Sequence, residues 1–138
     1  MREMKTVGGC LCSGVRYEIA GALGELVYCH CEQCRKAQGA VFAANVPVSV
    51  AHFSLTSGTE LLSSFRSSAE KVRYFCSRCG AGLYSLVDGA TRLRIRAGTL
   101  DDPPALQPCA HIYVESRVKW LDIGDELPRF IEKEPRDP

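Results

Sequence analysis

Seven of the eight cysteines in this 138-residue chain fall into three short clusters, and these clusters are the residues best suited to chemistry. Thiolates at such short spacings are typical zinc ligands in a reducing compartment, where disulfides are rare. The sequence therefore favours metal binding over a disulfide framework. The clustered residues are Cys10 and Cys12, then Cys29, Cys31 and Cys34, and then Cys76 and Cys79.

The two cysteine pairs have different local geometries. Residues two apart on an extended backbone point to the same face, so Cys10 and Cys12 are expected to present their sulfurs side by side. Cys76-Ser-Arg-Cys79, followed by Gly80, instead predicts a tight knuckle whose backbone N–H groups hydrogen-bond to the thiolates. Gly80 can take the positive φ that such a turn demands. Together the two pairs supply four ligands for a tetrahedral site.

The spacing alone leaves two partitions of the cysteines open. In the first, the two pairs form one closed site and the trio Cys29, Cys31 and Cys34 stays by itself; in the second, the trio takes a sulfur from another cluster. The first partition is more economical, because it completes one site and keeps the other local. A closed four-thiolate site is structural, whereas three protein ligands with an open position are typical of catalytic zinc.

Other uses of the trio also remain open. Both sites could be structural, with a fourth ligand from a histidine or from the remaining cysteine, although His30 lies between two ligands and should point away from them. The trio could instead cycle through a disulfide. An iron–sulfur cluster is disfavoured, because the spacing matches none of its usual ligand patterns. The available fourth ligands are His30, His52, His111 and Cys109.

The composition is that of one globular domain, residues 1–138, with a hydrophobic core. Hydrophobic residues make up 46% and charged residues 24%, and the net charge is +1, from 17 Lys and Arg against 16 Asp and Glu. This balance argues against a nucleic-acid or anionic-membrane binder. The acidic tail, residues 122–138, is expected to be solvated and mobile, which leaves a core of about residues 8–121.

The chain lacks the features of an exported or membrane protein. No apolar run approaches the roughly 20 residues needed to span a bilayer. The start, MREMKTVGGC, has no apolar segment of the kind that secretory signals contain. We therefore expect a cytoplasmic protein with reduced thiols.

Most of the chain predicts short strands. VRYEIA and RLRIRAG alternate apolar with polar residues, the latter with three arginines on one expected solvated face. Ser57-Gly58 and Asp88-Gly89 are typical of hairpin turns, and Pro47 favours an edge strand or a break. Helical composition is confined to EQCRKAQ, residues 32–38, which Gly39 would end. The sequence predicts a mainly β, largely antiparallel domain with little helix.

Five motifs in order resemble the glutathione-dependent formaldehyde-activating enzyme family, whose wider group includes centromere protein V. They are GGCLCSGVRYEI, YCHCEQCRKAQGAVF, FCSRCGAGLY, AGTLDD and HIYVESRVKWL, which together span Gly8 to about Leu121. The resemblance implies a zinc-stapled β-tent similar to that of the small guanine-nucleotide-exchange factor Mss4. One departure is Ser13, where glycine is common in the family; it affects a turn and no ligand.

The resemblance also implies the first partition, with two zinc ions per chain. A structural zinc would lie on Cys10, Cys12, Cys76 and Cys79, and a second, catalytic zinc on Cys29, Cys31 and Cys34. The implied activity is that of a carbon–sulfur lyase that forms or cleaves an S-hydroxymethylglutathione-like adduct, with glutathione and formaldehyde as small-molecule partners.

Cationic side chains are the natural partners of the two carboxylates of glutathione. Arg35 and Lys36 directly follow the trio and are the candidate substrate contacts. Two alternatives to this enzyme remain: a related enzyme acting on another thiol or aldehyde, and a zinc-stapled binding module without catalysis. The sequence leaves the oligomeric state, the fourth ligand of the second zinc and the role of Cys109 undetermined.

Overall fold

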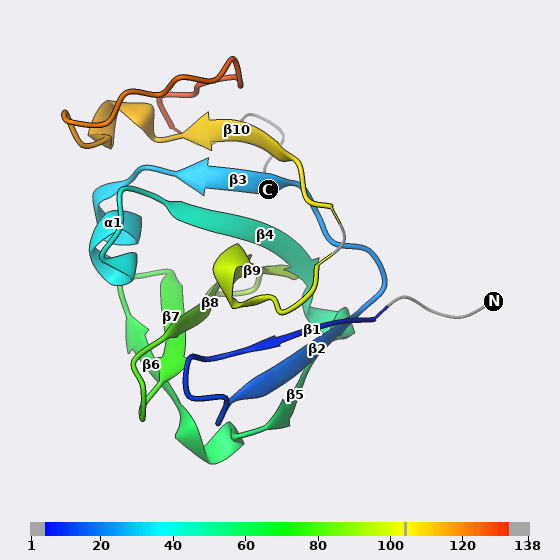
Figure 1. Ribbon diagram of the computed structural model, residues 1–138. Helices are drawn as coiled ribbons and strands as arrows, with labels where there is room; N and C mark the ends of the chain where they lie inside the picture. Colours follow the sequence, from blue (N-terminus) through cyan, green and yellow to red (C-terminus); the bar gives the residue numbers. More distant parts are fainter. Residues whose placement is uncertain (1–4, 104, 133–138) are drawn as a thin grey trace. The chain divides into compact units, whose positions relative to one another are not determined.

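The computed structural model describes residues 5–103 and 105–132, and it consists mainly of short β-strands (Figure 1). The chain divides into two compact units. The first unit comprises Met1–Gly24 and Val46–Ala105, and the second comprises Glu25–Asn45 and Leu106–Pro138. Within the described residues there is one α-helix, so the predicted mainly β fold with little helix is confirmed. That the chain is a single domain stays a prediction.

The first unit contains an antiparallel three-stranded sheet and a run of four antiparallel strands. The sheet has the order β1-β2-β5, from β1 (Lys5–Gly9), β2 (Arg16–Ala20) and β5 (Phe53–Ser57). The run has the order β9-β8-β7-β6, from β6 (Leu62–Arg66), β7 (Lys71–Cys76), β8 (Gly82–Val87) and β9 (Arg92–Arg96). Short 3₁₀ turns connect them at η1 (Val50–His52), η2 (Thr59–Leu61) and η3 (Ala97–Thr99).

The alternating sequences form the strands they predict, and apolar side chains bury one face. In β2, Tyr17 and Ile19 are almost fully buried, which is the pattern of a strand with one face on a core. β9 buries Leu93 and Ile95 in the same way. The expected solvated row of arginines is wrong at Arg96, whose side chain is 4% exposed.

Two turn predictions have different outcomes. Asp88-Gly89 joins β8 to β9, which pair antiparallel, so the predicted hairpin is confirmed. Ser57-Gly58 instead connects β5 to β6, which belong to different sheets, so no hairpin forms there. Gly58 still takes the positive φ, 79°, that marks a tight turn.

The second unit is built around the strand order β10-β3-β4 and one helix. Its elements are β3 (Leu26–Cys29), α1 (Glu32–Gln38), the start of β4 (Ala43–Ser49), β10 (Pro108–Ile112) and the 3₁₀ turn η4 (Val114–Ser116). β3 pairs antiparallel with β4 but parallel with β10, a pairing that the expectation of antiparallel strands did not include. Parallel pairing is possible here because β3 and β10 are far apart in sequence and need no hairpin.

Pro47 lies inside β4, so the prediction of an edge strand or a break is wrong. β4 has β3 and β9 as neighbours in the strand order. Its ladder with β3 uses residues 43–45 and stops short of the proline. Proline has no backbone N–H, but the ladder with β3 needs no donor at residue 47. Pro47 is therefore tolerated in β4.

The segment that follows β10 returns to it. The backbone N–H of His111 donates to the Pro128 carbonyl at 2.9 Å, and that of Phe130 donates to the His111 carbonyl at 2.9 Å. Residues 128–130 thus hydrogen-bond to β10, although they lie in the tail expected to be mobile. Residues 133–138 lie outside the described part, so mobility of the tail stays a prediction. No helix among the described residues has the length and apolar character needed to cross a membrane.

Candidate functional site

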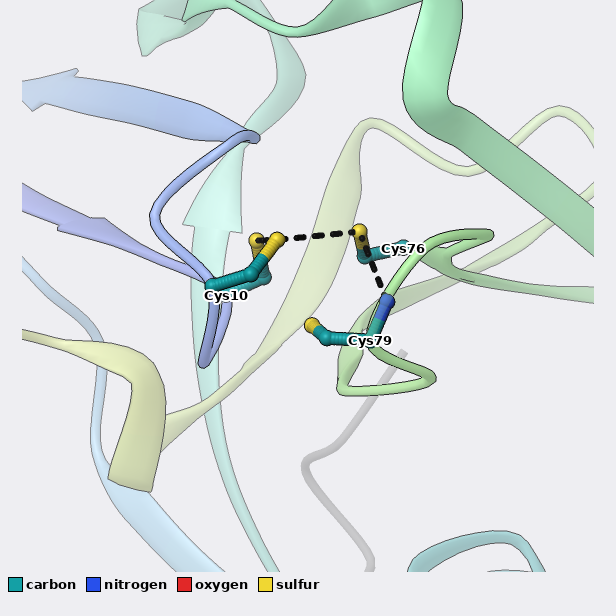
Figure 2. A group of neighbouring side chains, drawn as sticks. Cys10, Cys76 and Cys79 are labelled. Carbon is teal, nitrogen blue, oxygen red and sulfur yellow. Dashed lines mark hydrogen bonds between the residues drawn. The ribbon is translucent and has the colours of Figure 1, made fainter.

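Cys10, Cys12, Cys76 and Cys79, here called the quartet, come together in the first unit as the first partition requires. Their sulfurs all lie within 4.8 Å of one another. Cys12 Sγ is 3.6 Å from Cys10 Sγ and 3.8 Å from Cys76 Sγ, and the labelled side chains point toward a common centre (Figure 2). Four sulfurs about 2.3 Å from a tetrahedral zinc would be about 3.8 Å apart. The quartet therefore fits zinc in both donor type and spacing.

Backbone N–H groups reach the quartet sulfurs, as the knuckle motif predicts. The N–H groups of Arg78 and Cys79 donate to Cys76 Sγ at 3.4 and 3.5 Å, and Val15 N–H donates to Cys10 Sγ at 3.2 Å. Gly80 closes the knuckle with φ 79°, so its predicted positive φ is confirmed. These donors stabilise thiolates by offering them hydrogen bonds.

A cationic donor and backbone amides lower the pKa values of two quartet thiols, whereas at Cys76 the backbone hydrogen bonds from Cys79 are outweighed by burial and neighbouring sulfurs, which raise its pKa. The Arg78 side chain donates from Nε to Cys12 Sγ at 3.2 Å, and the pKa of Cys12 is lowered by Gly14 backbone hydrogen bonding and then by Arg78. The pKa of Cys79 is lowered to about 6, mainly by hydrogen bonding to the Ala81 backbone. A thiol with so low a pKa is a metal ligand with little proton competition at neutral pH.

Cys29, Cys31 and Cys34, here called the trio, come together in the second unit. Cys29 ends β3, Cys31 is the N-cap of α1, and Cys34 is one of the helix residues. The three sulfurs lie within 4.8 Å of one another. Cys31 Sγ accepts the Cys34 backbone N–H at 3.3 Å, so the cluster itself caps the helix.

The position of Cys34 relative to Cys31 depends on where α1 begins, and both ends of this helix are fixed by capping residues. Cys31 has the extended backbone of an N-cap, with φ −64° and ψ 154°. Gly39 takes the left-handed conformation, with φ 61°, and its N–H bonds to the Arg35 carbonyl, so the predicted helix end is confirmed. Cys34 follows Cys31 by a little less than one helical turn, so the first turn of α1 brings the two residues to the same side of the helix.

The trio lies in an apolar environment. Cys29, Cys34, Ala43 and Ile112 form a buried cluster, and the partly buried Val27, Cys31, Tyr113 and Phe130 pack against it. The pKa of Cys29 is raised, first by hydrogen bonding to the sulfurs of Cys31 and Cys34 and then by burial. Such a thiol keeps its proton unless a cation replaces it.

The donor chemistry of the trio also fits a metal ion. Three neighbouring thiolates repel one another, and the neighbouring sulfurs raise the pKa of Cys29. A bound dication would displace the thiol protons and offset the negative charges of the three thiolates. In the unit that contains the trio, His30, His111 and Cys109 do not join it within this distance among the described residues. His52 belongs to the other unit. Three ligands are thus in place, and the fourth ligand stays open.

Arg35 and Lys36 lie on α1 but differ in their surroundings. Lys36 is exposed and pairs with Glu32 at 3.3 Å, one helical turn away. Arg35 is partly buried, and its Nε is a buried donor without a hydrogen-bond partner among the described residues. A buried, unpaired donor costs free energy unless it meets an acceptor, so Arg35 is the better candidate for an anionic group.

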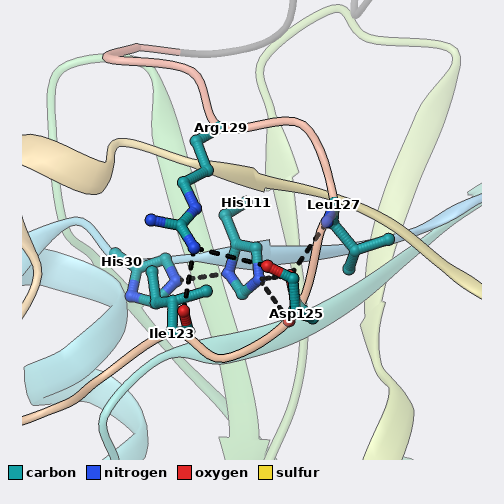
Figure 3. A network of polar contacts seen from close by, with 6 residues as sticks. All are labelled: His30, His111, Ile123, Asp125, Leu127 and Arg129. Atoms are coloured by element: carbon teal, nitrogen blue, oxygen red, sulfur yellow. Dashed lines mark hydrogen bonds and ion pairs between the residues drawn. The ribbon is translucent and has the colours of Figure 1, made fainter.

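A buried polar network adjoins the trio, and the sequence analysis missed it. His30 Nε2 lies 2.8 Å from His111 Nδ1, and His111 Nε2 lies 2.9 and 3.1 Å from the Asp125 carboxylate oxygens (Figure 3). His30 and His111 are 0% and 2% exposed. Burial, more than neighbouring charges, lowers the pKa of His30 to about 4. A histidine between two cysteine ligands was the available signal, but nothing in the spacing pointed to Asp125.

Comparison with known proteins bears on both clusters. The glutathione-dependent formaldehyde-activating enzyme family matches residues 5–116, which include all seven clustered cysteines. The chain belongs to this family. The family match covers most of the chain, so the resemblance found in the sequence motifs is confirmed.

Two individual proteins are similar to this family member. A Fusarium vanettenii protein, provisionally named a glutathione-dependent formaldehyde-activating enzyme, is 30% identical over 79 residues, which are 57% of this chain. The match spans 42% of that relative's length. The crystal structure of a Rhodobacter sphaeroides protein has a TM-score of 0.60 at 20% identity, over 73% of this chain and 91% of that one. This likeness shows the fold alone.

Proposed function

We propose that the protein is a zinc-dependent carbon–sulfur lyase that forms or cleaves an S-hydroxymethylglutathione-like adduct from glutathione and formaldehyde. Family membership supports glutathione and formaldehyde as the substrates. The observation that carries the proposal is the trio, three thiols gathered at the start of a helix in an apolar environment. Under this proposal the quartet holds a structural zinc, and Cys29, Cys31 and Cys34 hold a catalytic one.

The reaction joins a thiol sulfur to the carbonyl carbon of formaldehyde. A carbon–sulfur bond forms, the carbonyl π bond breaks, and the thiol proton ends on the oxygen as a hydroxyl. When bound by the trio, zinc would favour the thiolate form of the incoming thiol, which a free thiol with a pKa near 8.5 rarely adopts at neutral pH. The apolar residues around the trio limit water near the sulfurs, and this strengthens the local electrostatics.

The helix residues that follow the trio supply the substrate contact. We assign Arg35 to a glutathione carboxylate, because its buried Nε lacks a partner among the described residues and a guanidinium binds carboxylates with two parallel hydrogen bonds. Lys36 is assigned a weaker, long-range role, because it already pairs with Glu32 and is largely exposed. Holding the thiol beside the trio would supply part of the rate by positioning.

The direct test compares Cys31→Ser with Cys109→Ser in zinc-loaded protein. Cys31 belongs to the trio and Cys109 to neither cluster, so both variants remove one thiol but only the first removes a proposed catalytic ligand. Adduct formation from glutathione and formaldehyde is followed by NMR, and zinc content is measured in parallel. We expect Cys31→Ser to lose at least about a hundredfold in rate while Cys109→Ser keeps it.

The result that contradicts the proposal is an undiminished rate in Cys31→Ser. The same experiment separates the two alternatives. A zinc-stapled binding module would bind one tightly held zinc and show no acceleration in either protein. An enzyme for another thiol would bind two zinc ions in the wild-type protein and would accelerate the reaction only when glutathione is replaced by a different thiol.

A further inference from the structure

The network of His30, His111 and Asp125 belongs to the second unit, and the function proposed above assigns it no role. Aromatic rings hold both imidazoles in place. The Phe42 ring centroid is 5.1 Å from that of His30, and the Tyr28 ring centroid is 5.2 Å from that of His111. With both rings buried and packed against aromatic side chains, each imidazole keeps one orientation.

The hydrogen bonds fix where the protons lie when both imidazoles are neutral. The His111 hydrogen bond lowers the pKa of Asp125, so this carboxylate is ionised at neutral pH and can only accept. His111 Nε2 must therefore carry a proton, which leaves its Nδ1 as an acceptor. His30 Nε2 then donates to His111 Nδ1, and His30 Nδ1 is left with a bare lone pair.

His30 Nδ1 is a buried acceptor without a hydrogen-bond partner among the described residues. Figure 3 shows this nitrogen on the side of the ring that faces away from His111. In the sequence, His30 stands between the trio ligands Cys29 and Cys31. A buried polar atom without a partner costs free energy, so it calls for an explanation such as a catalytic role or a partner that binds there.

We propose that Asp125 and His111 are positioning residues for the trio site, which hold His30 in its Nε2–H tautomer so that Nδ1 is a fixed acceptor for the S–H or O–H of a thiol substrate or its hydroxymethyl adduct. The naming of this substrate class rests on the proposed function. Asp125 lies in the segment that follows β10, far from the trio in sequence. Under this proposal, that segment therefore contributes a residue to the site through its contact with His111.

The tautomer is tested by long-range ¹H–¹⁵N NMR on the full, zinc-loaded chain, which needs no activity. The chain has three histidines, and the exposed His52 serves as an internal reference. We expect His30 and His111 each to show an unprotonated Nδ1 and a protonated Nε2. A proton on His30 Nδ1, or a doubly protonated His111 that donates to His30, would overturn the proposal.

The acceptor role is tested by adding glutathione and formaldehyde to the same sample. We expect the His30 Nδ1 resonance to move in the direction of an accepted hydrogen bond, while that of His52 stays fixed. If cobalt substituted at the trio registers glutathione binding but His30 Nδ1 does not move, the acceptor role is wrong. If zinc-loaded wild-type protein binds glutathione and moves Nδ1 without accelerating the reaction, the proposed function fails and the positioning role stands.

Asp125→Asn tests the positioning role against its matched control Glu126→Gln. Asparagine keeps the shape of the side chain and can still accept the Leu127 N–H, whereas the exposed Glu126 is the neighbouring acid. We expect Asp125→Asn to mix the His30 tautomers and to lower kcat at least about tenfold with KM for glutathione little changed. An unchanged tautomer and kcat, or an equal loss in Glu126→Gln, would overturn the assignment.

Discussion

The two cysteine clusters use the same ligand type but treat the sulfurs differently. The quartet sulfurs accept backbone N–H groups and the guanidinium of Arg78, and the pKa of Cys79 is lowered to about 6, although that of Cys76 is raised. In the trio, the Cys34 N–H reaches Cys31 Sγ, but apolar side chains surround the sulfurs, and the pKa of Cys29 is raised by the neighbouring sulfurs and then by burial. Hydrogen bonds disperse thiolate charge and reduce reactivity, whereas an apolar surrounding keeps a metal-bound thiolate reactive. This difference is the one expected if the quartet is structural and the trio catalytic, as we propose.

The largest effect should distinguish the clusters by what each contributes to folding. Cys76→Ser removes a fully buried quartet ligand, and structural zinc supplies roughly 10 kcal/mol or more of apparent binding free energy. This equals the whole stability of a typical domain, so the variant should be unfolded at room temperature. Cys31→Ser should keep a cooperative thermal transition by circular dichroism. Equal loss of folding in both variants would remove the contrast.

Acid should release the two metal ions in a fixed order. The pKa of Cys79 is lowered, so its ionisation stabilises the folded state at neutral pH, and this contribution is lost as pH falls through about 6. The pKa of Cys29 is raised, so the proton already competes with metal at neutral pH; in the quartet, the raised pKa of Cys76 is accompanied by lowered values at Cys12 and Cys79. Titrating two-zinc protein downward should therefore empty the trio first, as followed with a chromophoric chelator. Release of the quartet zinc first would reverse the comparison.

A smaller effect should follow from removing the cationic donor of the quartet. Arg78→Ala deletes the hydrogen bond to Cys12 Sγ, so the quartet zinc should be released to a chelator about threefold to tenfold faster. Arg66→Ala is the matched control, because it removes an exposed arginine of the same unit that pairs with Asp88 instead. Similar release rates in the two variants would show that Arg78 has no effect on the metal.

The smallest effects concern backbone conformation beside each cluster. Ser13 follows Cys12 with φ 62°, so Ser13→Gly should relieve strain and stabilise the fold by about 0.5–1 kcal/mol. Gly39 ends the trio helix with φ 61° and has nothing within 4 Å of an added Cβ, so Gly39→Ala should cost about 1 kcal/mol. Urea unfolding of two-zinc protein measures both. If Ser13→Gly lowered the free energy of unfolding, or if Gly39→Ala raised it, the conformational explanation would be contradicted.

The sequence predicts local features well, because their causes are local. Two-residue and three-residue cysteine spacings specify a pair and a knuckle, and the Gly39 stop specifies the helix end. The gathering of Cys10 and Cys12 with Cys76 and Cys79 could be inferred only as the more economical partition and from the family resemblance, since spacing says nothing of distant segments. Pro47 was misjudged because its missing donor matters only where a ladder partner is present.

The network around His30 could not be predicted, because it depends on tertiary contacts. Asp125 lies in an acidic segment whose composition suggested only a solvated tail. It approaches His111 because residues 128–130 hydrogen-bond back to β10. Tyr113 takes φ 56° and precedes a 3₁₀ turn, so the strand that contains His111 ends at Ile112. Neither feature has a signature in the periodicity of the sequence.

The central claim is that the trio, and not the quartet, accepts an external thiol. Cobalt substituted at both clusters reports its ligands through its visible absorption spectrum, and Cys31→Ser removes the contribution of the trio. The account predicts that glutathione changes the thiolate-to-cobalt absorption of the wild-type protein and leaves that of Cys31→Ser unchanged. An unchanged wild-type spectrum at saturating glutathione would contradict it.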